Sequence, residues 1–144
     1  MKDLYLFAYD GSAASVRALK FGTGRARAAG ADVMLAHVLE WSPYSFLTAE
    51  ELAERHKRRE AEVARAETII LEPVRKQLSD AGLPVRTVIR YGHVAETLAE
   101  IAREVQATQI FVGRTGESKL AARLFGSVAG TLAQIAPVPC TIVP

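Results

Sequence analysis

The chain has 144 residues, of which 49% are hydrophobic and 24% charged, and this suits a single domain over residues 1–144 with a buried core. Its 18 Lys and Arg nearly balance its 16 Asp and Glu, and a net charge of +2 excludes the strongly basic surface typical of nucleic-acid-binding proteins. The single cysteine excludes an intrachain disulfide, no export signal is visible, and no apolar run approaches about 18 residues, so we expect a cytoplasmic protein without membrane insertion.

The first part of the chain predicts a strand, a helix and a second strand. Residues 4–9 form a continuous apolar run, which is typical of a strand buried on both faces. Ser12 is the predicted N-cap of a helix over 13–29, and Gly30 provides its C-terminal stop. Residues 32–38 predict the second strand. The helix over 13–29 is indicated by an alanine-rich stretch and by the apolar positions Val16, Leu19 and Phe21.

The middle of the chain predicts a long, highly charged helix. Thr48 and Glu51 have the spacing of a capping box, so the helix should begin there. The dense charge from Glu50 to Arg65 is most simply a solvated face, and a partner-binding helix or a cover for one flank of a ligand crevice are the alternatives. We expect Pro73 to kink or restart this helix before it ends near residue 82.

The second half of the chain continues the alternation of strands and helices. Residues 85–90 alternate between two faces, one of them more polar, so we expect this strand at a sheet edge. Apolar residues at helical spacing predict a helix over 94–105, and residues 127–136 predict the last helix. Residues 109–112 and 140–143 predict the remaining strands. The α/β pattern therefore predicts a doubly wound, five-stranded parallel sheet in a three-layer α/β/α domain.

A glycine-rich segment follows the strand at 109–112. Gly113, Gly116, Gly126 and Ser127 give the spacing G-x2-G-x9-G-S, whereas the spacings of a P-loop and of a dinucleotide-binding loop do not occur. Main-chain N–H groups of such a loop can hold an anion, and the amino end of the following helix also favours one. The alternative is that the glycines only shape a turn. Ligands of such sheets bind where the strands end and the crossover direction reverses, which is where this segment lies.

The chain resembles the UspA-like universal stress proteins, and within them the ATP-binding branch that carries G-x2-G-x9-G-[ST] after the fourth strand. The likeness covers essentially the whole length. Besides the glycine-rich segment, it rests on Tyr9-Asp10-Gly11-Ser12, Leu35-Ala36-His37-Val38, Gly92-His93-Val94-Ala95-Glu96 and the ending Pro137-Val138-Pro139-Cys140-Thr141-Ile142-Val143-Pro144.

This resemblance implies an adenine nucleotide alpha hydrolase-like fold with strand order 3-2-1-4-5, ATP in the crevice, and a homodimer through the fifth strands. Whether two such dimers pair into a tetramer stays open. Val38 would meet the adenine edge through its backbone, and Asp10 would lie beside the nucleoside and assist Mg²⁺ held by the phosphates. Thr115 stands where the family often has histidine, and Ala129 where it often has a hydroxyl residue, so fewer phosphate donors are available. The nucleotide-binding residues implied by position are Ala8, Tyr9, Asp10, Val38, Val112, Gly113, Thr115, Gly116, Gly126, Ser127 and Val128.

Other readings of single residues stay open. Asp10 has an alternative role as a turn-forming side chain before Gly11. We expect His37 to be a buried, hydrogen-bonded histidine and Cys140 a small apolar side chain. Three scattered histidines and one cysteine give no metal-ligand spacing. Residues 41–47, rich in aromatic side chains, are predicted to be a lid or a contact with a target protein.

The sequence favours a regulatory ATP-binding protein of the stress response, with a target protein still to be identified, over an enzyme. No residue is an obvious base for an attacking water, so no catalytic residue is assigned and we expect at most slow ATP hydrolysis. The first alternative is an interaction protein of the same fold that binds no nucleotide. The second, an adenylating ligase, would need the loop S-G-G-x-D-S after the first strand, which residues 10–15 do not supply.

Overall fold

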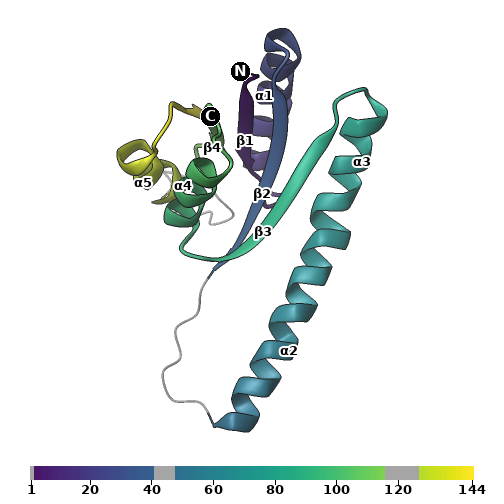
Figure 1. Cartoon of the computed structure of the whole chain (residues 1–144), viewed down its shortest axis with the longest axis vertical. Helices are drawn as coiled ribbons and strands as arrows, with labels where there is room; N and C mark the ends of the chain where they lie inside the picture. The colour runs from purple at the N-terminus through teal and green to yellow at the C-terminus, as the bar shows by residue number, and fades with distance from the viewer. Residues whose placement is uncertain (1, 41–47, 116–126) are drawn as a thin grey trace.

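The strands form one parallel sheet in the order β3-β2-β1-β4-β5. The computed structural model describes residues 2–40, 48–115 and 127–144, arranged as Figure 1 shows. The predicted strand order and the edge position of β3 are confirmed. The bounds are β1 (Leu4–Ala8), β2 (Asp32–Glu40), β3 (Val85–Gly92), β4 (Gln109–Gly113) and β5 (Cys140–Val143).

Helices cover both faces of the sheet, as predicted. Successive side chains of a strand point to opposite faces, so Leu6 packs in the core beneath α4 and α5, whereas Phe7 packs in the core beneath α1, η1 and α3. No helix within the described ranges is long and apolar enough to cross a membrane. The helices are α1 (Ala13–Ala29), α2 (Ala49–Arg65), the π-helical η1 (Ala66–Leu71), α3 (Glu72–Asp80), α4 (Val94–Glu104) and α5 (Ser127–Ile135).

Helix α1 packs through its small residues and not through most of its large ones. Phe7 and Phe111 stack on the sheet beneath it, with ring centroids 4.8 Å apart. A Cβ atom on Gly22 would lie 2.1 Å from the Phe7 ring, so the helix can approach the rings only because this position has no side chain. Of the apolar positions that indicated the helix, Leu19 is buried, whereas Val16 and Phe21 are 46% and 43% exposed.

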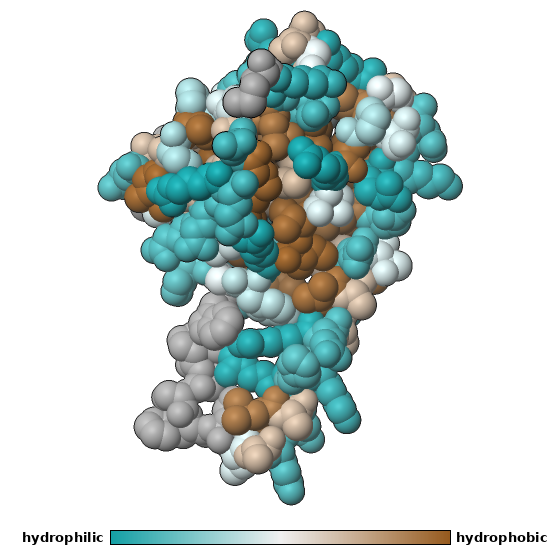
Figure 2. Space-filling model, viewed as in Figure 1, coloured by the Kyte–Doolittle hydropathy of each residue, from teal (hydrophilic) through white to brown (hydrophobic). Residues whose placement is uncertain are grey.

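The charged helix α2 is a solvated element, as predicted. Thr48 caps it by accepting a hydrogen bond at 3.1 Å from the N–H of Glu51. No residue of α2 is buried, Figure 1 shows the helix projecting past the ends of the strands, and Figure 2 shows hydrophilic side chains over most of its visible surface. Its attachment to the sheet includes Tyr91 of β3, whose hydroxyl donates a 2.7 Å hydrogen bond to the Glu62 carboxylate.

The restart expected at Pro73 takes a form that the sequence did not predict. The helix does not stop but passes through the π-helical turn η1, and a new α-helix begins at Glu72, one residue before the proline. Pro73 lies in the first turn of α3, where the hydrogen bonding changes from the π to the α pattern, and the first turn is the part of a helix that tolerates proline.

Candidate functional site

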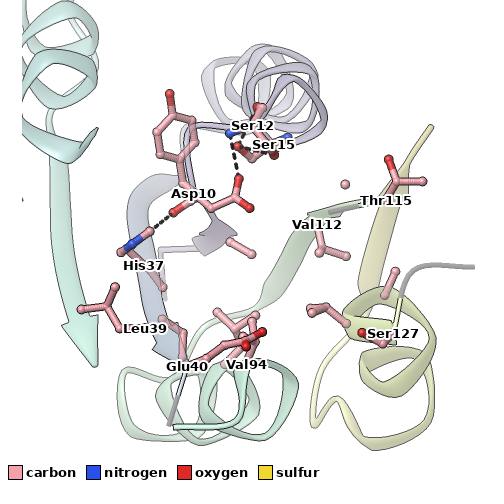
Figure 3. A pocket seen from close by; sticks show the side chains of 18 of the residues that line it. Asp10, Ser12, Ser15, His37, Leu39, Glu40, Val94, Val112, Thr115 and Ser127 are labelled. Atoms are coloured by element: carbon pink, nitrogen blue, oxygen red, sulfur yellow. Dashed lines mark hydrogen bonds between the residues drawn. The ribbon is translucent and has the colours of Figure 1, made fainter. Parts of the chain in front are cut away.

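A cavity of about 550 Å³ lies at the carboxyl ends of β1, β2 and β4. Its position follows from the connections, because β1 leads into α1 on one face of the sheet and β4 precedes α5 on the other, which separates the two strand ends. Figure 3 shows Asp10 from the end of β1, Val94 from α4 and Ser127 from α5 around the same opening. The volume lies within the range typical of small-molecule sites, roughly 300 to 1,000 Å³.

The cavity gathers nine of the eleven predicted nucleotide-binding residues, and their contact with a ligand remains a prediction. Gly116 and Gly126, together with the segment 41–47 predicted as a lid or a target contact, lie outside the described residues. Arg114 also lines the cavity and could act as a charge partner for an anion. The nine are Ala8, Tyr9, Asp10, Val38, Val112, Gly113, Thr115, Ser127 and Val128.

The backbone of Val38 faces this cavity. Parallel strands direct the N–H and C=O groups of alternate residues toward the same neighbouring strand. Tyr9 donates its N–H to the Ala36 carbonyl oxygen at 2.9 Å, so Ala36 faces β1, and Val38, two residues later, faces the same side. Since β1 has ended there, β2 has no paired strand on that side beyond Ala36 within the described residues. Val38 therefore offers one donor and one acceptor to whatever fills the cavity.

Asp10 combines a turn-forming role with one oxygen left over. Its Oδ1 atom accepts a 2.9 Å hydrogen bond from the N–H of Ser12, across Gly11, whose φ of +81° is one that glycine adopts without strain. Ser12 then caps α1 by accepting from the N–H of Ser15 at 3.2 Å, as predicted. Oδ2 of Asp10 accepts no hydrogen bond from the described residues, and the carboxylate points into the opening in Figure 3. Both roles considered for Asp10 are thus compatible with its geometry.

His37 of β2 holds the end of β1, as expected of a buried and hydrogen-bonded histidine. It is 7% exposed, and its Nδ1 atom lies 2.8 Å from the carbonyl oxygen of Tyr9. A carbonyl oxygen can only accept, so Nδ1 must carry the proton. The Tyr9 side chain is buried in the core beneath α1 and α3, and burial, followed by the charge of Asp10, raises the pKa of its hydroxyl.

Gly113 has a packing role that is independent of any ligand. A Cβ atom there would lie 2.9 Å from the Cβ of Ala14 and 3.0 Å from its carbonyl carbon and oxygen. The end of β4 therefore approaches the first turn of α1 only because residue 113 lacks a side chain. This contact supports the alternative that glycine at this position serves the turn, although it does not prevent a ligand from approaching the other side of the backbone.

Part of the cavity lining is apolar and was not predicted from the sequence. Val94 and Leu98 come from α4, one helical turn apart, and Ile70 comes from η1. The helical stripe of α4 predicted which residues are apolar but not that the first of them reach the cavity. Ile70 gave no signal, because its position depends on a π turn. At the rim, Glu40 adds a second carboxylate besides Asp10.

The described residues contain no group of three His, Cys, Asp or Glu side chains able to hold a metal ion. Asp10 and Glu40 both line the cavity, so a divalent cation carried by the phosphates of a ligand would meet carboxylate oxygens there. The donors present fit a nucleotide with such a cation, since apolar residues, a backbone donor and acceptor pair and the free oxygen of Asp10 line one cavity. Cys140 is half-buried against the α4 and α5 core, and burial raises the pKa of its thiol.

Comparison with known proteins places the chain in a family. The model of the universal stress protein family matches residues 5–144. The universal stress protein MJ0531 of Methanocaldococcus jannaschii is 31% identical over 137 residues, which cover 93% of this chain and 77% of that protein.

Solved structures share the fold. UspA from Lactobacillus plantarum superposes with a TM-score of 0.84 at 21% identity, covering 99% of this chain and 97% of that one. The universal stress protein from Archaeoglobus fulgidus in complex with dAMP has a TM-score of 0.66 at 20% identity, covering 100% and 98%. With a family model that matches nearly the whole length and a relative above 30% identity, the chain belongs to the universal stress protein family.

Proposed function

We propose that this chain binds an adenine nucleotide, ATP with Mg²⁺ on its phosphates, in the cavity at the ends of β1, β2 and β4. The observation that carries the proposal is the joint placement in one cavity of the Val38 backbone and of Asp10 Oδ2, which accepts no hydrogen bond from the described part of the chain. A relative of the same fold was solved with dAMP, which supports an adenine nucleotide as the ligand.

The described residues suit different parts of such a ligand. The donor and acceptor of Val38 match the amino group and ring nitrogen on one edge of adenine. The second oxygen of Asp10 can accept a hydrogen bond from a ribose hydroxyl. Ser127, at the start of α5, would meet the phosphates together with the N–H groups of that helix end and of the glycine-rich segment. The contacts of Gly116 and Gly126 remain part of the proposal only.

The protein is proposed to act as a regulatory homodimer in the cytoplasm, whose nucleotide occupancy changes its interaction with a target protein. Strand β5 pairs with β4 on one side, and within the described residues no strand covers its other edge. An uncovered strand edge is suited to pairing with the same strand of a second copy, and two such dimers could form a tetramer. We further propose that any ATP turnover is slow, because the sequence offers no obvious base for an attacking water.

A second candidate is an interaction protein of the same fold that binds no nucleotide. The packing of Gly113 against Ala14 favours it, because this glycine is required whether or not a ligand is present. The two candidates differ in their response to nucleotides.

A thermal unfolding series with ATP, ADP, AMP and GTP separates the candidates. If the dissociation constant for ATP is micromolar, millimolar ATP should stabilise the fold by about 4 kcal/mol, which corresponds to an increase of several degrees in Tm. GTP should stabilise it less, because guanine carries an oxygen where adenine has its amino group. A Tm that none of the four nucleotides changes would favour the interaction protein.

A further inference from the structure

The π turn η1 directs two residues of one long helix into the core at an unusual spacing. Ala66 is 3% and Leu71 is 1% exposed, five positions apart. In an α-helix, residues five apart point in directions about 140° apart, whereas a π turn closes over five residues and brings them to one face. Ile69, between them, is 59% exposed.

Because Leu71 takes the core position, Ile70 is left at the border between the core and the cavity. It is half-buried against the core beneath α1 and α3, and it also lines the cavity. Its Cγ2 atom lies 3.7 Å from the place that a Cβ on Gly11 would occupy, so its side chain lies next to the turn that follows Asp10. Ile70 therefore supplies an aliphatic surface to the cavity that Asp10 also lines.

The cavity thus has aliphatic walls from both layers of helices. Val94 and Leu98 of α4 come from one face of the sheet, and Ile70 comes from the other. Aliphatic side chains favour contact with the carbon surfaces of a base or a sugar, and they offer nothing to a phosphate.

We propose that Ile70 is a ligand-contacting residue that packs against the nucleoside half of the nucleotide, and that the π turn places it there. This inference rests on the proposed function. It extends the site to the α2–η1–α3 helix, which no glycine or phosphate motif in the sequence marks. If Ile70 contacts only the nucleoside, it should contribute equally to the binding of nucleotides with one or three phosphates.

The test compares Ile70→Ala with its neighbour Ile69→Ala in the full chain. Dissociation constants for ATP, AMP and inorganic tripolyphosphate are measured by calorimetry, with circular dichroism and thermal unfolding without ligand as a check on folding. Removing three carbons from a half-buried contact should weaken ATP and AMP binding by about fivefold each. Ile69→Ala removes the same carbons from an exposed position and should leave both constants unchanged.

The conservative variant Ile70→Val guards against a folding defect in Ile70→Ala, and it should weaken both nucleotides by about twofold. Equal constants for the Ile69 and Ile70 variants would overturn the role of Ile70 while leaving the proposed function intact. A loss that appears for ATP and tripolyphosphate but not for AMP would also overturn it, because the contact would then involve phosphate. If the unchanged protein binds no adenine nucleotide, the proposed function fails and this inference fails with it.

Discussion

The Nδ1 atom of His37 lies 2.8 Å from the carbonyl oxygen of Tyr9, one residue beyond the end of β1. This hydrogen bond joins the end of β1 to β2 just where the backbone pairing of the two strands stops. It fixes the protonated nitrogen of a buried imidazole and the direction in which the chain enters the Asp10 turn. The shape of the cavity mouth therefore depends on a side chain that need not touch the ligand.

We expect His37→Ala to lower the free energy of unfolding by about 3 kcal/mol, because it leaves a cavity and removes a buried hydrogen bond. Chemical denaturation by urea measures the change. His93→Ala is the matched control, since His93 is exposed and makes no side-chain cap hydrogen bond to α4. Equal stability of the two variants would contradict the structural role of His37.

Two glycines of α1 should respond to alanine in opposite directions. A Cβ atom on Gly22 would lie 2.1 Å from the Phe7 ring and 2.9 Å from the Phe111 ring, so Gly22→Ala should cost about 2 to 3 kcal/mol of stability through overpacking. Gly24 has no atom within 4 Å of its Cβ position, so Gly24→Ala should stabilise the helix by about 0.5 to 1 kcal/mol. Urea unfolding of both variants gives the comparison, and a Gly22→Ala protein as stable as the Gly24→Ala one would show that the helix does not pack as described.

Tyr91 should make stability depend on pH in the alkaline range. Burial, then its hydrogen bond to Glu62, raise the pKa of the Tyr91 hydroxyl from 10.0 to about 12. The folded state therefore holds this proton more tightly than the unfolded state, so the contribution is complete below pH 10 and is lost as the pH rises from 10 to about 12. In Tyr91→Phe, stability should fall less steeply over that range. The buried Tyr9, whose pKa is also raised, leaves a residual slope. Identical pH profiles for the two proteins would rule out the Tyr91 contribution.

Substitutions at Asp10 should separate its two roles. Asp10→Asn keeps an oxygen for the N–H of Ser12 but removes the charge and the second acceptor, so ATP binding should weaken by about tenfold or more with little change in stability. Asp10→Ala removes both roles and should also lose about 1 kcal/mol of stability. Calorimetry and urea unfolding on the same samples measure the two effects. Undiminished ATP affinity in Asp10→Asn would restrict Asp10 to forming the turn.

The sequence predicted the architecture better than it predicted contacts. Hydrophobic patterns located each strand to within about two residues. The run at 4–9 was continuous, as expected of a strand buried on both faces, whereas 85–90 alternated, as expected at a sheet edge. Val16 and Phe21 show the limit of this approach: apolar identity marked the helix, but the stacked rings of Phe7 and Phe111 determine that small residues face the sheet.

In the candidate site too, the positions of the strand ends could be predicted from the sequence, whereas individual contacts could not. Residues at strand ends, such as Asp10 and Val38, could be placed because parallel strands end at one edge. Ile70 could not, because its orientation depends on the π turn η1, which was not predicted from the sequence. Gly113 was assigned to the nucleotide site from the glycine spacing. Only the structure shows that the close packing of Ala14 leaves no room for a side chain at this position.

The most direct measurement is a calorimetric titration of the full chain with ATP in the presence of Mg²⁺. We predict one ATP bound per chain with a dissociation constant in the micromolar range, near −8 kcal/mol, and a clear loss of affinity in Asp10→Asn titrated alongside. No saturable binding up to millimolar ATP, with a chain that is folded by circular dichroism, would contradict nucleotide binding in this cavity.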